Sequence, residues 1–544
     1  MTDSTTVAAL SNAHDEHSEQ GFKREMGFWG NLALGFTYLS PVVGVYTTIG
    51  LALAIAGPIS FWTLVVAGLG QLLVALVFGE IVSQYPIAGG IYPWNRRLWG
   101  AKWGWMSGWV YAVAINATIA SVAFGVGPFL GAFLGIETNP GTNVILALVV
   151  IAFSTLMNFG GTRLLSVVAF IGFSLEIIAT IVIGIWLLVA ARQHDLSVFF
   201  TDFRPLDVQE NEPLFVAFAF SAILGIFLYY GFEANGDVAE EVKDPGRVIP
   251  KAMRTTLYVG GVASMFIGMG LILAIPDYAA VIRGENTDPV TGIFQTTFGP
   301  IGFKIVLLLI MISYVSCTIS LQAAASRLLF SMGRDKQLPG WSALRKFSVK
   351  RAVPPYALLV AGILPALIVV VSLFSADALI AVISFASLGI YLAFFSAVLA
   401  SFRARLKGWQ PKGPFKMGRW GWPVTIAAGL YQIAAMIMLV WPVEDAENWF
   451  QRYLVSAVGV IVLVIGVIYL FTTRPDKRGG GPAGDAHTGV VNMHYASPIA
   501  PSEEIVDMAV LLSGGKPHYY PHAPQNESSS DSSAKNSQNT EGEK

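Results

Sequence analysis

The sequence predicts an all-α integral membrane protein with twelve transmembrane helices. Of the 544 residues, 54% are hydrophobic and only 13% are charged, whereas soluble domains carry about 25% charged residues. A helix needs about 20 mostly apolar residues to cross a bilayer, and twelve stretches of about that length or more follow one another along the chain. Their lengths fit helices rather than strands. Because the spans are apolar, we expect the lipid bilayer to be a partner of the protein.

The expected spans share this apolar character and are separated by more polar segments. They lie at residues 29–56, 59–84, 103–134, 142–160, 163–191, 213–242, 252–275, 300–332, 354–374, 376–401, 420–442 and 448–472.

Two polar segments flank this membrane domain of residues 29–473. Residues 1–28 carry acids and lack the basic segment and short apolar core of a cleaved signal. Residues 474–544 are rich in Gly, Ser, Pro and Asn and bury too little apolar area to fold alone. We therefore expect a disordered N-terminus, an uncleaved signal anchor in the first span and a disordered C-terminal tail.

The distribution of Lys and Arg orients the chain. With both termini in the cytoplasm, twenty Lys and Arg residues fall on internal loops and adjoining span ends, and five fall on the opposite side. Because cytoplasmic loops carry an excess of positive charge, this bias supports cytoplasmic termini, an even number of spans and a plasma or inner membrane location. The net charge of −1 gives no sign of a nucleic acid partner.

Cysteine and histidine usage excludes several classes of site. Cys317 is the only cysteine, and all seven histidines lie outside the expected spans. This pattern excludes an intramolecular disulfide, a cysteine-rich metal site and an intramembrane haem, zinc or copper centre, so no cofactor or metal is expected. A primary pump would need a nucleotide-binding motif such as "GxxxxGK[ST]", and an enzyme would need paired intramembrane catalytic groups. The sequence has neither pattern, which argues against both classes.

Two of the expected spans are interrupted by residues that disfavour a helix. The first contains "YLSPVVGVYTTIG" with Pro41, and the sixth contains "YYGFEANGDVAEE" with Gly231 and Gly236. Proline removes a backbone donor, and glycine loosens the turn. Because the breaks lie five spans apart, a second five-helix unit would cross in the opposite sense, which predicts inverted repeats at 29–191 and 213–401. Matching interruptions point to a transporter binding site, while a simple kink is the alternative for the first span.

Three further stretches resemble, in the expected order, signatures of the amino acid-polyamine-organocation (APC) superfamily of permeases. They are "GEIVSQYPIAGGIYPWNRRLWG" (79–100), "YYGFEANGDVAEEVKDPGRVIPKAM" (229–253) and "SRLLFSMGRDKQLP" (326–339). Within the superfamily, the chain resembles the branch of amino acid, choline and 4-aminobutyrate transporters. The resemblance implies a LeuT-like fold of 5+5 inverted repeats with broken helices 1 and 6, added helices 11 and 12, and a substrate near the midplane.

The resemblance also implies a function. A permease of this kind is a secondary active transporter that imports a small amino acid or amine by alternating access, and protons are the favoured coupling ion. A sodium-coupled symporter or an exchanger of the same fold is one alternative, and a transporter-like nutrient sensor is another. The sequence leaves open whether the protein is a monomer or a homodimer.

The two breaks supply the expected substrate site. The N-terminus of a half-helix carries partial positive charge, so the first break would receive an acidic group of the substrate, and carbonyls of the second would receive its amino group. An aromatic ring at this level would close over the substrate or hold an ammonium, although packing is an equal alternative for one of the two tyrosines. The expected substrate-binding residues are Ser40, Val43, Gly44 and Val45 in the first break and Tyr229, Tyr230, Gly231 and Ala234 in the second.

Four residues are candidates for ion coupling. Glu233 lies in the second break, where a carboxylate is costly, which predicts a proton carrier or a tie between the broken helices. Glu176 lies deep in the fifth span, at about the position where proton-driven members of the resembled family carry a lysine. Ser316 and Ser320 in the eighth span offer hydroxyls to sodium, although such residues are also common in membrane helix packing. Both H+ and Na+ therefore remain candidate coupling ions.

A third group of residues lies toward the expected cytoplasmic side. Asp237 and Glu240 follow Glu233 at the end of the sixth span, and Arg334 lies at the exit of the eighth. We expect these residues to pair across an inner gate. The alternative is an ordinary solvated helix end whose arginine serves as a positive-inside anchor.

Overall fold

The chain divides into two units, residues 1–497 and residues 498–544. For the first unit, the computed structural model describes residues 22–286, 288–373, 376–442, 449–479 and 482–486. For the second unit it describes two short antiparallel strands, β1 (Ile505–Val506) and β2 (Tyr519–Tyr520), with Ile505 opposite Tyr520.

Helices build the described part of the first unit and coincide with the expected spans. The first half contains α2 (Phe28–Leu39), α3 (Pro41–Ala56), η1 (Gly57–Phe61), α4 (Trp62–Gln84), α5 (Ile91–Leu98), α6 (Ala101–Gly125), α7 (Gly127–Leu134), α8 (Pro140–Asn158), α9 (Thr162–Ala190), η2 (Leu196–Phe200) and α10 (Leu206–Asn211). The rest contains α11 (Leu214–Ser221), α12 (Ile223–Leu228), α13 (Ala234–Asp237), η3 (Ala239–Glu241), α14 (Pro245–Ala274), α15 (Tyr278–Ile282), α16 (Pro289–Arg334), α17 (Trp341–Leu344), α18 (Pro355–Val371), α19 (Ala376–Leu406), η4 (Gly418–Trp420), α20 (Gly421–Leu439), α21 (Trp449–Arg452), α22 (Leu454–Thr473) and η5 (Pro475–Lys477).

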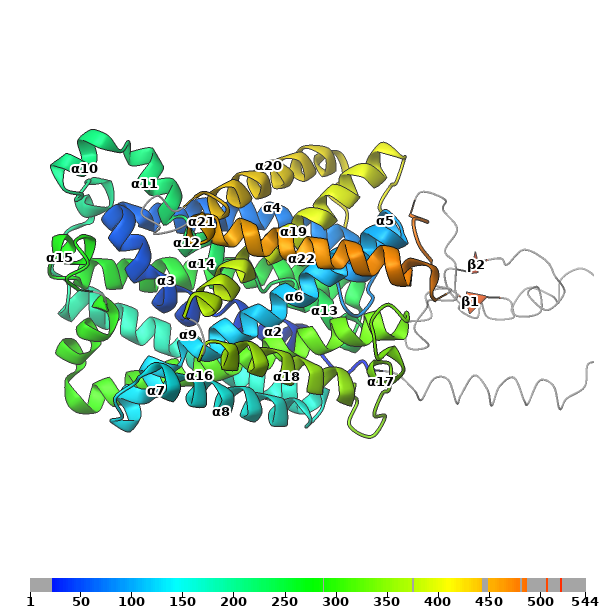
Figure 1. Ribbon diagram of the computed structural model, residues 1–544, viewed down its shortest axis with the longest axis horizontal. Helices are drawn as coiled ribbons and strands as arrows, with labels where there is room; N and C mark the ends of the chain where they lie inside the picture. Colours follow the sequence, from blue (N-terminus) through cyan, green and yellow to red (C-terminus); the bar gives the residue numbers. More distant parts are fainter. Residues whose placement is uncertain are drawn as a thin grey trace, which may run out of the picture. The chain divides into compact units, whose positions relative to one another are not determined.

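The long helices run along a common direction, as α4, α9, α16 and α22 show in Figure 1. Within the described residues, nine helical stretches are long and apolar enough to cross a membrane, and one of them, Phe28–Gln84, contains the first two expected spans. Two shorter apolar helices, Leu214–Leu228 and Pro355–Val371, coincide with the sixth and ninth expected spans. These findings confirm a multi-pass helical membrane protein, while the count of twelve spans and the inverted repeat stay predictions.

Both sequence interruptions break their helices. At the first, Ser40 has φ 41° and ψ 93° and separates α2 from α3. A residue that precedes a proline is hindered from entering the helical region, and Pro41 follows directly. At the second, α12 ends at Leu228 and α13 begins at Ala234.

The two breaks pack directly against each other. Gly231 has φ 118°, a conformation that side chains disfavour, and a Cβ there would lie 2.6 Å from the backbone nitrogen of Leu39. Likewise, a Cβ on Gly44 would meet the side chain of Leu228. Glycine is therefore required at position 231, where the backbones of the two broken helices approach each other, whereas a side chain at position 44 would displace the Leu228 side chain.

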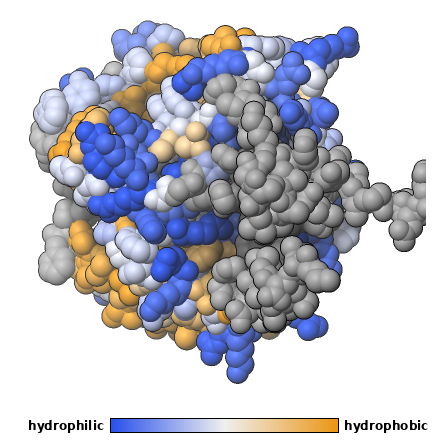
Figure 2. All heavy atoms as spheres, turned by 90° about the vertical axis from the view of Figure 1, so that its right-hand side faces the viewer, coloured by the Kyte–Doolittle hydropathy of each residue, from blue (hydrophilic) through white to orange (hydrophobic). Residues whose placement is uncertain are grey.

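The surface of the first unit suits a bilayer. Large apolar side chains such as Leu156 and Val189 are 67% and 81% exposed, as expected for helix faces that contact lipid. Figure 2 shows the face at the α5 and α17 side, where hydrophilic residues are spread over the visible surface and hydrophobic residues gather mainly at the top and the lower left.

The first residues of the expected C-terminal tail pack against the helical unit. The Gln337 side chain donates hydrogen bonds of 3.0 Å to the carbonyls of Pro475 and Arg478. Asp485 forms an ion pair of 3.0 Å with Arg97 on α5. The folded unit thus includes the described residues of 22–28 and 474–486, for which the sequence predicts disorder. The disorder predicted for residues 1–21 and 487–497 lies outside the described residues, as does that predicted for residues 498–544 apart from β1 and β2.

Candidate functional site

A small cavity lies between the two breaks. Its volume is about 10 Å³, which is about what one water molecule needs. The buried hydroxyls of Tyr38 and Tyr230 lie at this wall, with Glu233 near the first and Thr118 and Ser387 near the second, so the wall carries polar groups. Three of the expected substrate-binding residues, Val43, Gly44 and Tyr230, are part of it. The complete lining is Tyr38, Leu39, Val43, Gly44, Thr118, Val122, Phe227, Tyr230, Cys317 and Leu321.

The carboxylate of Glu176 caps the N-terminus of α3. Its Oε1 accepts hydrogen bonds from the Ser40 hydroxyl at 2.7 Å and from the Val42 amide at 3.0 Å. Glu176 belongs to α9, so this contact ties the fifth expected span to the break in the first. A carboxylate at a helix N-terminus is stabilised by the free amides and by the helix dipole.

The other first-turn amides of α3 are also satisfied by the chain itself. Pro41 has no N–H, the Val43 amide donates to the Ser40 hydroxyl at 3.3 Å, and the Gly44 amide donates to the Ser40 carbonyl at 2.9 Å. The backbone donors expected to receive an acidic group of the substrate therefore have partners within the protein in this conformation.

Two carboxylates of the second break share one tyrosine. Glu233 accepts from the Gly231 amide at 2.6 Å through Oε2 and from the Tyr111 hydroxyl at 3.5 Å through Oε1. The same hydroxyl lies 2.8 Å from Asp237 Oδ2. Asp237 thus lies beside Glu233, whereas we expected it to pair across the gate with a basic residue.

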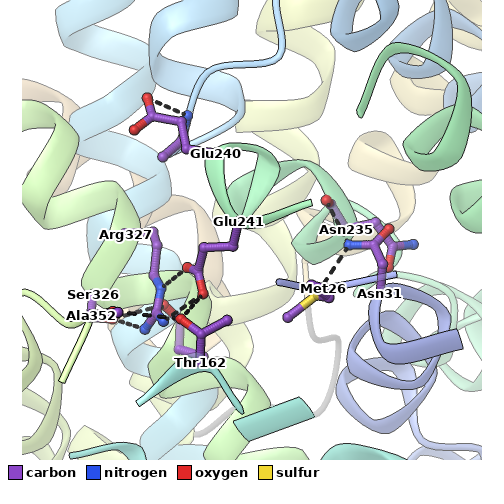
Figure 3. A network of polar contacts seen from close by, with 11 residues as sticks. Met26, Asn31, Thr162, Asn235, Glu240, Glu241, Ser326, Arg327 and Ala352 are labelled. Atoms are coloured by element: carbon purple, nitrogen blue, oxygen red, sulfur yellow. Dashed lines mark hydrogen bonds and ion pairs between the residues drawn. The ribbon is translucent and has the colours of Figure 1, made fainter. Parts of the chain in front are cut away.

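Two ion pairs join the end of the second break to α16. Arg327 lies 2.7 Å from Glu241, and both side chains are almost completely buried. The Thr162 hydroxyl, at the start of α9, donates to the other Glu241 oxygen at 2.5 Å, as Figure 3 shows. Arg334 lies 3.0 Å from Glu240, so this predicted pair does meet.

A third acid, Asp335, extends this network to α5. It accepts from the Tyr92 hydroxyl at 2.6 Å and lies 4.0 Å from Arg96. Burial raises the pKa of Asp335 above its ordinary value, although nearby arginines oppose the shift. Burial also raises the pKa of Tyr92 well above its ordinary value. The Ala88 amide, just before α5, donates to Glu240 at 3.2 Å, so α5 and the loop before it contact both acids.

The N-terminal segment covers the same network. The Met26 amide donates to the Glu241 carbonyl at 3.0 Å, and the Phe22 ring lies 5.6 Å from the guanidinium of Arg327. These contacts hold residues before the first helix against the buried ion pair.

Five expected substrate-binding residues are not part of the cavity wall: Ser40, Val45, Tyr229, Gly231 and Ala234. Tyr229 packs between α4 and α14, since a Cβ on Gly68 or Gly261 would approach its ring at 3.1 or 3.5 Å. Val45 is buried within α3, and Ala234 begins α13, where its amide donates to the carbonyl of Gly231. These residues belong to the two broken helices but do not face the cavity.

The two candidate sodium ligands lie one turn apart on α16 but have different neighbours. The Ser320 hydroxyl lies 2.7 Å from the Thr37 hydroxyl on α2. Ser316 faces Gly172 on α9 and lines a second, larger hollow of about 330 Å³ with apolar neighbours. Among the described residues, no cluster of three or more His, Cys, Asp or Glu side chains could hold a metal ion.

The roles of two residues, Tyr111 and Glu80, could not be predicted from the sequence. Tyr111 is one aromatic residue among many in an apolar span, so nothing marked it as the donor shared by two carboxylates. Glu80 stands out only as an acid at the end of an apolar stretch. It forms a buried ion pair with Arg405 and accepts from the Met417 amide at 3.0 Å, which fastens the loop after α19.

Comparison with known proteins identifies the family. The family model described as "Amino acid permease" matches residues 26–472. The chain is 26% identical over 488 residues to the rice (Oryza sativa subsp. japonica) "Amino-acid permease BAT1 homolog". This alignment covers 85% of this chain and 93% of the relative. It is 24% identical over 335 residues to the "Serine/threonine exchanger SteT" of Bacillus subtilis, covering 59% of this chain and 71% of the relative. It is also 23% identical over 498 residues to the "Thiamine transporter thi9" of Schizosaccharomyces pombe, covering 82% and 83%. With its helical membrane fold and a match across most of its length, the chain belongs to the amino acid permease family of the APC superfamily.

Proposed function

We propose that this permease is a proton-coupled secondary active transporter that imports a small amino acid or amine by alternating access. The observation that carries the proposal is the small cavity between two broken helices, with buried tyrosine hydroxyls in its wall. Irregular backbone at membrane depth is tolerated where it lines such a cavity, and substrate sites of transporters are built from interrupted helices. The names of the relatives, which include permeases, an exchanger and a vitamin transporter, support a small solute.

The proposal includes the architecture expected from the sequence. Twelve spans would form two inverted five-helix repeats plus two added helices, in the plasma or inner membrane, with both termini in the cytoplasm. The positive-inside bias supports this orientation, and the meeting of the two breaks supports the repeat. In this arrangement the ion pairs of Glu240 and Glu241 lie on the cytoplasmic side and close the path inward.

Protons are the proposed coupling ion because buried carboxylates lie at both breaks. Glu233 and Asp237 are buried beside each other and share the hydroxyl of Tyr111, and two like charges in one site do not both ionise readily. Within the described residues, neither acid forms an ion pair with a basic side chain. A site of this kind suits the uptake and release of a proton.

Uptake into proteoliposomes with separately imposed proton and sodium gradients tests the proposal. Each coupled proton lets a gradient of one pH unit sustain about a tenfold accumulation of substrate. Replacing Glu233 with Gln should remove about that factor while leaving the folded protein intact. Accumulation driven by sodium alone would refute proton coupling, and uptake that requires an internal amino acid would favour an exchanger. If none of the solutes tried is transported, the alternative function of a transporter-like nutrient sensor would be favoured.

A further inference from the structure

The N-terminus of α3 is occupied by a side chain that belongs to neither broken helix. Glu176 comes from α9, which is continuous from Thr162 to Ala190, and reaches the Ser40 hydroxyl and the Val42 amide with the same oxygen, Oε1. An acidic group of a substrate would need these same donors, because they are the hydrogen-bond donors that this helix end presents.

The second carboxylate oxygen of Glu176 is unsatisfied. Oε2 has no hydrogen-bond partner within the described residues, and the side chain is only 1% exposed. A buried, unpartnered carboxylate oxygen is unfavourable. The arrangement therefore combines an anion-binding helix end with an internal anion that is only half satisfied.

Few titratable groups surround Glu176. The phenol of Tyr46 on α3 and the thiol of Cys317 on α16 are the titratable groups that interact with it electrostatically. No Asp, Glu, Lys, Arg or His in the described parts of α2, α3, α14 and α16, the elements packed near it, forms an ion pair with it. The state of this carboxyl group thus depends mainly on its own proton and on the donors of α3.

We infer that Glu176 and the carboxylate of an amino acid substrate compete for the N-terminus of α3, so that the substrate carboxylate binds when Glu176 is protonated. This inference rests on the proposed transport function and names the substrate class as a molecule with both an amino and a carboxylate group.

The charge balance follows from the exchange of one anion for another. Glu176 takes up one proton and releases the Ser40 hydroxyl and the Val42 amide. These two groups then donate to the substrate carboxylate, and the net charge at the helix end is unchanged. Two carboxylates in the same place would repel each other, so binding of the substrate takes up one proton. When the substrate leaves, Glu176 returns to the helix end and releases the proton.

The test compares amino acids with their decarboxylated amines on the purified full-length protein. Binding of L-serine, L-alanine, L-arginine and 4-aminobutyrate, and of ethanolamine, ethylamine, agmatine and propylamine, is measured calorimetrically between pH 5.5 and 7.5. For the wild type, Kd of an amino acid should rise about tenfold per pH unit where one proton is linked to binding. Glu176→Gln should bind the amino acid with the low-pH affinity at every pH, because the amide side chain mimics the protonated acid.

Two control measurements separate this effect from others. The amine partners lack the competing carboxylate, so Glu176→Gln should leave the pH dependence of their binding unchanged. Glu233→Gln, which changes the other buried acid, should retain the pH dependence caused by Glu176. A melting temperature close to that of the wild type shows that each variant is folded.

Three results overturn the inference. One is an unchanged pH dependence of amino acid binding in Glu176→Gln, and another is weaker binding by this variant at low pH. The third is binding of amines alone, which leaves the transport function standing but removes the substrate carboxylate. Failure of every solute to bind or to be taken up would instead refute the proposed function together with the inference.

Discussion

The buried pair of Arg327 and Glu241 gives the sharpest prediction about the gate. It joins η3 to α16, and the Thr162 hydroxyl adds α9 to the same contact. Glu241→Gln removes the charge that satisfies Arg327 and leaves the guanidinium buried without its ion pair. If the cytoplasmic side must open for the substrate to leave, this change should favour the open form.

The size of the effect follows from burial. The two side chains are 1% and 0% exposed, and removing one partner of a buried pair costs about 3 to 5 kcal/mol. Each 1.4 kcal/mol is about a tenfold change in an equilibrium. The population of the inward-open form should therefore rise at least about 100-fold, until that form dominates.

The single cysteine of the chain provides the assay. Cys317 lines the cavity, is buried and donates to the Tyr38 carbonyl at 3.2 Å. Its modification by a membrane-impermeant thiol reagent, measured in inside-out vesicles, should be slow in the wild type and much faster in Glu241→Gln. Cys317→Ala gives the background. Arg283→Ala serves as a matched control, because its pair with Glu285 is exposed and such pairs contribute about 0 to 1 kcal/mol.

A second variant keeps the prediction testable if the single change damages the protein. Arg327→Met combined with Glu241→Met replaces the ion pair by apolar side chains of similar volume, which is often neutral for stability. This double variant should recover slow labelling. The reasoning is refuted if folded Glu241→Gln labels within about threefold of the wild type, since the closed form would then not depend on the pair.

Three other changes test separate parts of the structure. Tyr111→Phe removes the hydroxyl shared by two carboxylates and should lower proton-driven uptake about 5- to 150-fold, as expected for about 1 to 3 kcal/mol lost at a buried acceptor. Unchanged uptake would contradict the proposed proton site. Gly231→Ala should abolish uptake because the added Cβ would strike the backbone of Leu39. Gly284→Ala, at a positive φ in open space, should lower uptake only slightly. Equal effects of the two substitutions on uptake would disprove the close approach of the two broken helices. Glu80→Gln should lower the melting temperature measured in detergent, because it breaks a buried pair, and a change within error would show that the loop does not need it.

The sequence was sufficient to predict the positions of the helices and of their two interruptions. Apolar length and composition determine which segments lie in a bilayer, and the helices of the described residues coincide with the expected spans. Proline after Ser40 and glycine at position 231 act locally on the backbone, so both breaks were predictable. The pairing of Glu240 with Arg334 also followed, since opposite charges at the same end of two spans tend to meet.

Only the tertiary structure decided how the acids divide among partners. Residues from α9 and α6 approach the breaks because helices far apart in the sequence pack together, and no local pattern encodes that approach. Thus Glu176 reaches the Val42 amide across 134 positions, Asp237 joins Glu233 through Tyr111, and Ser320 meets Thr37 on α2. The sequence by itself determined a helical membrane permease with two broken spans, because those properties depend on hydrophobicity and backbone chemistry. The three-dimensional packing determined which carboxylate meets which donor, because hydrogen bonds form only at distances that the chain order does not specify.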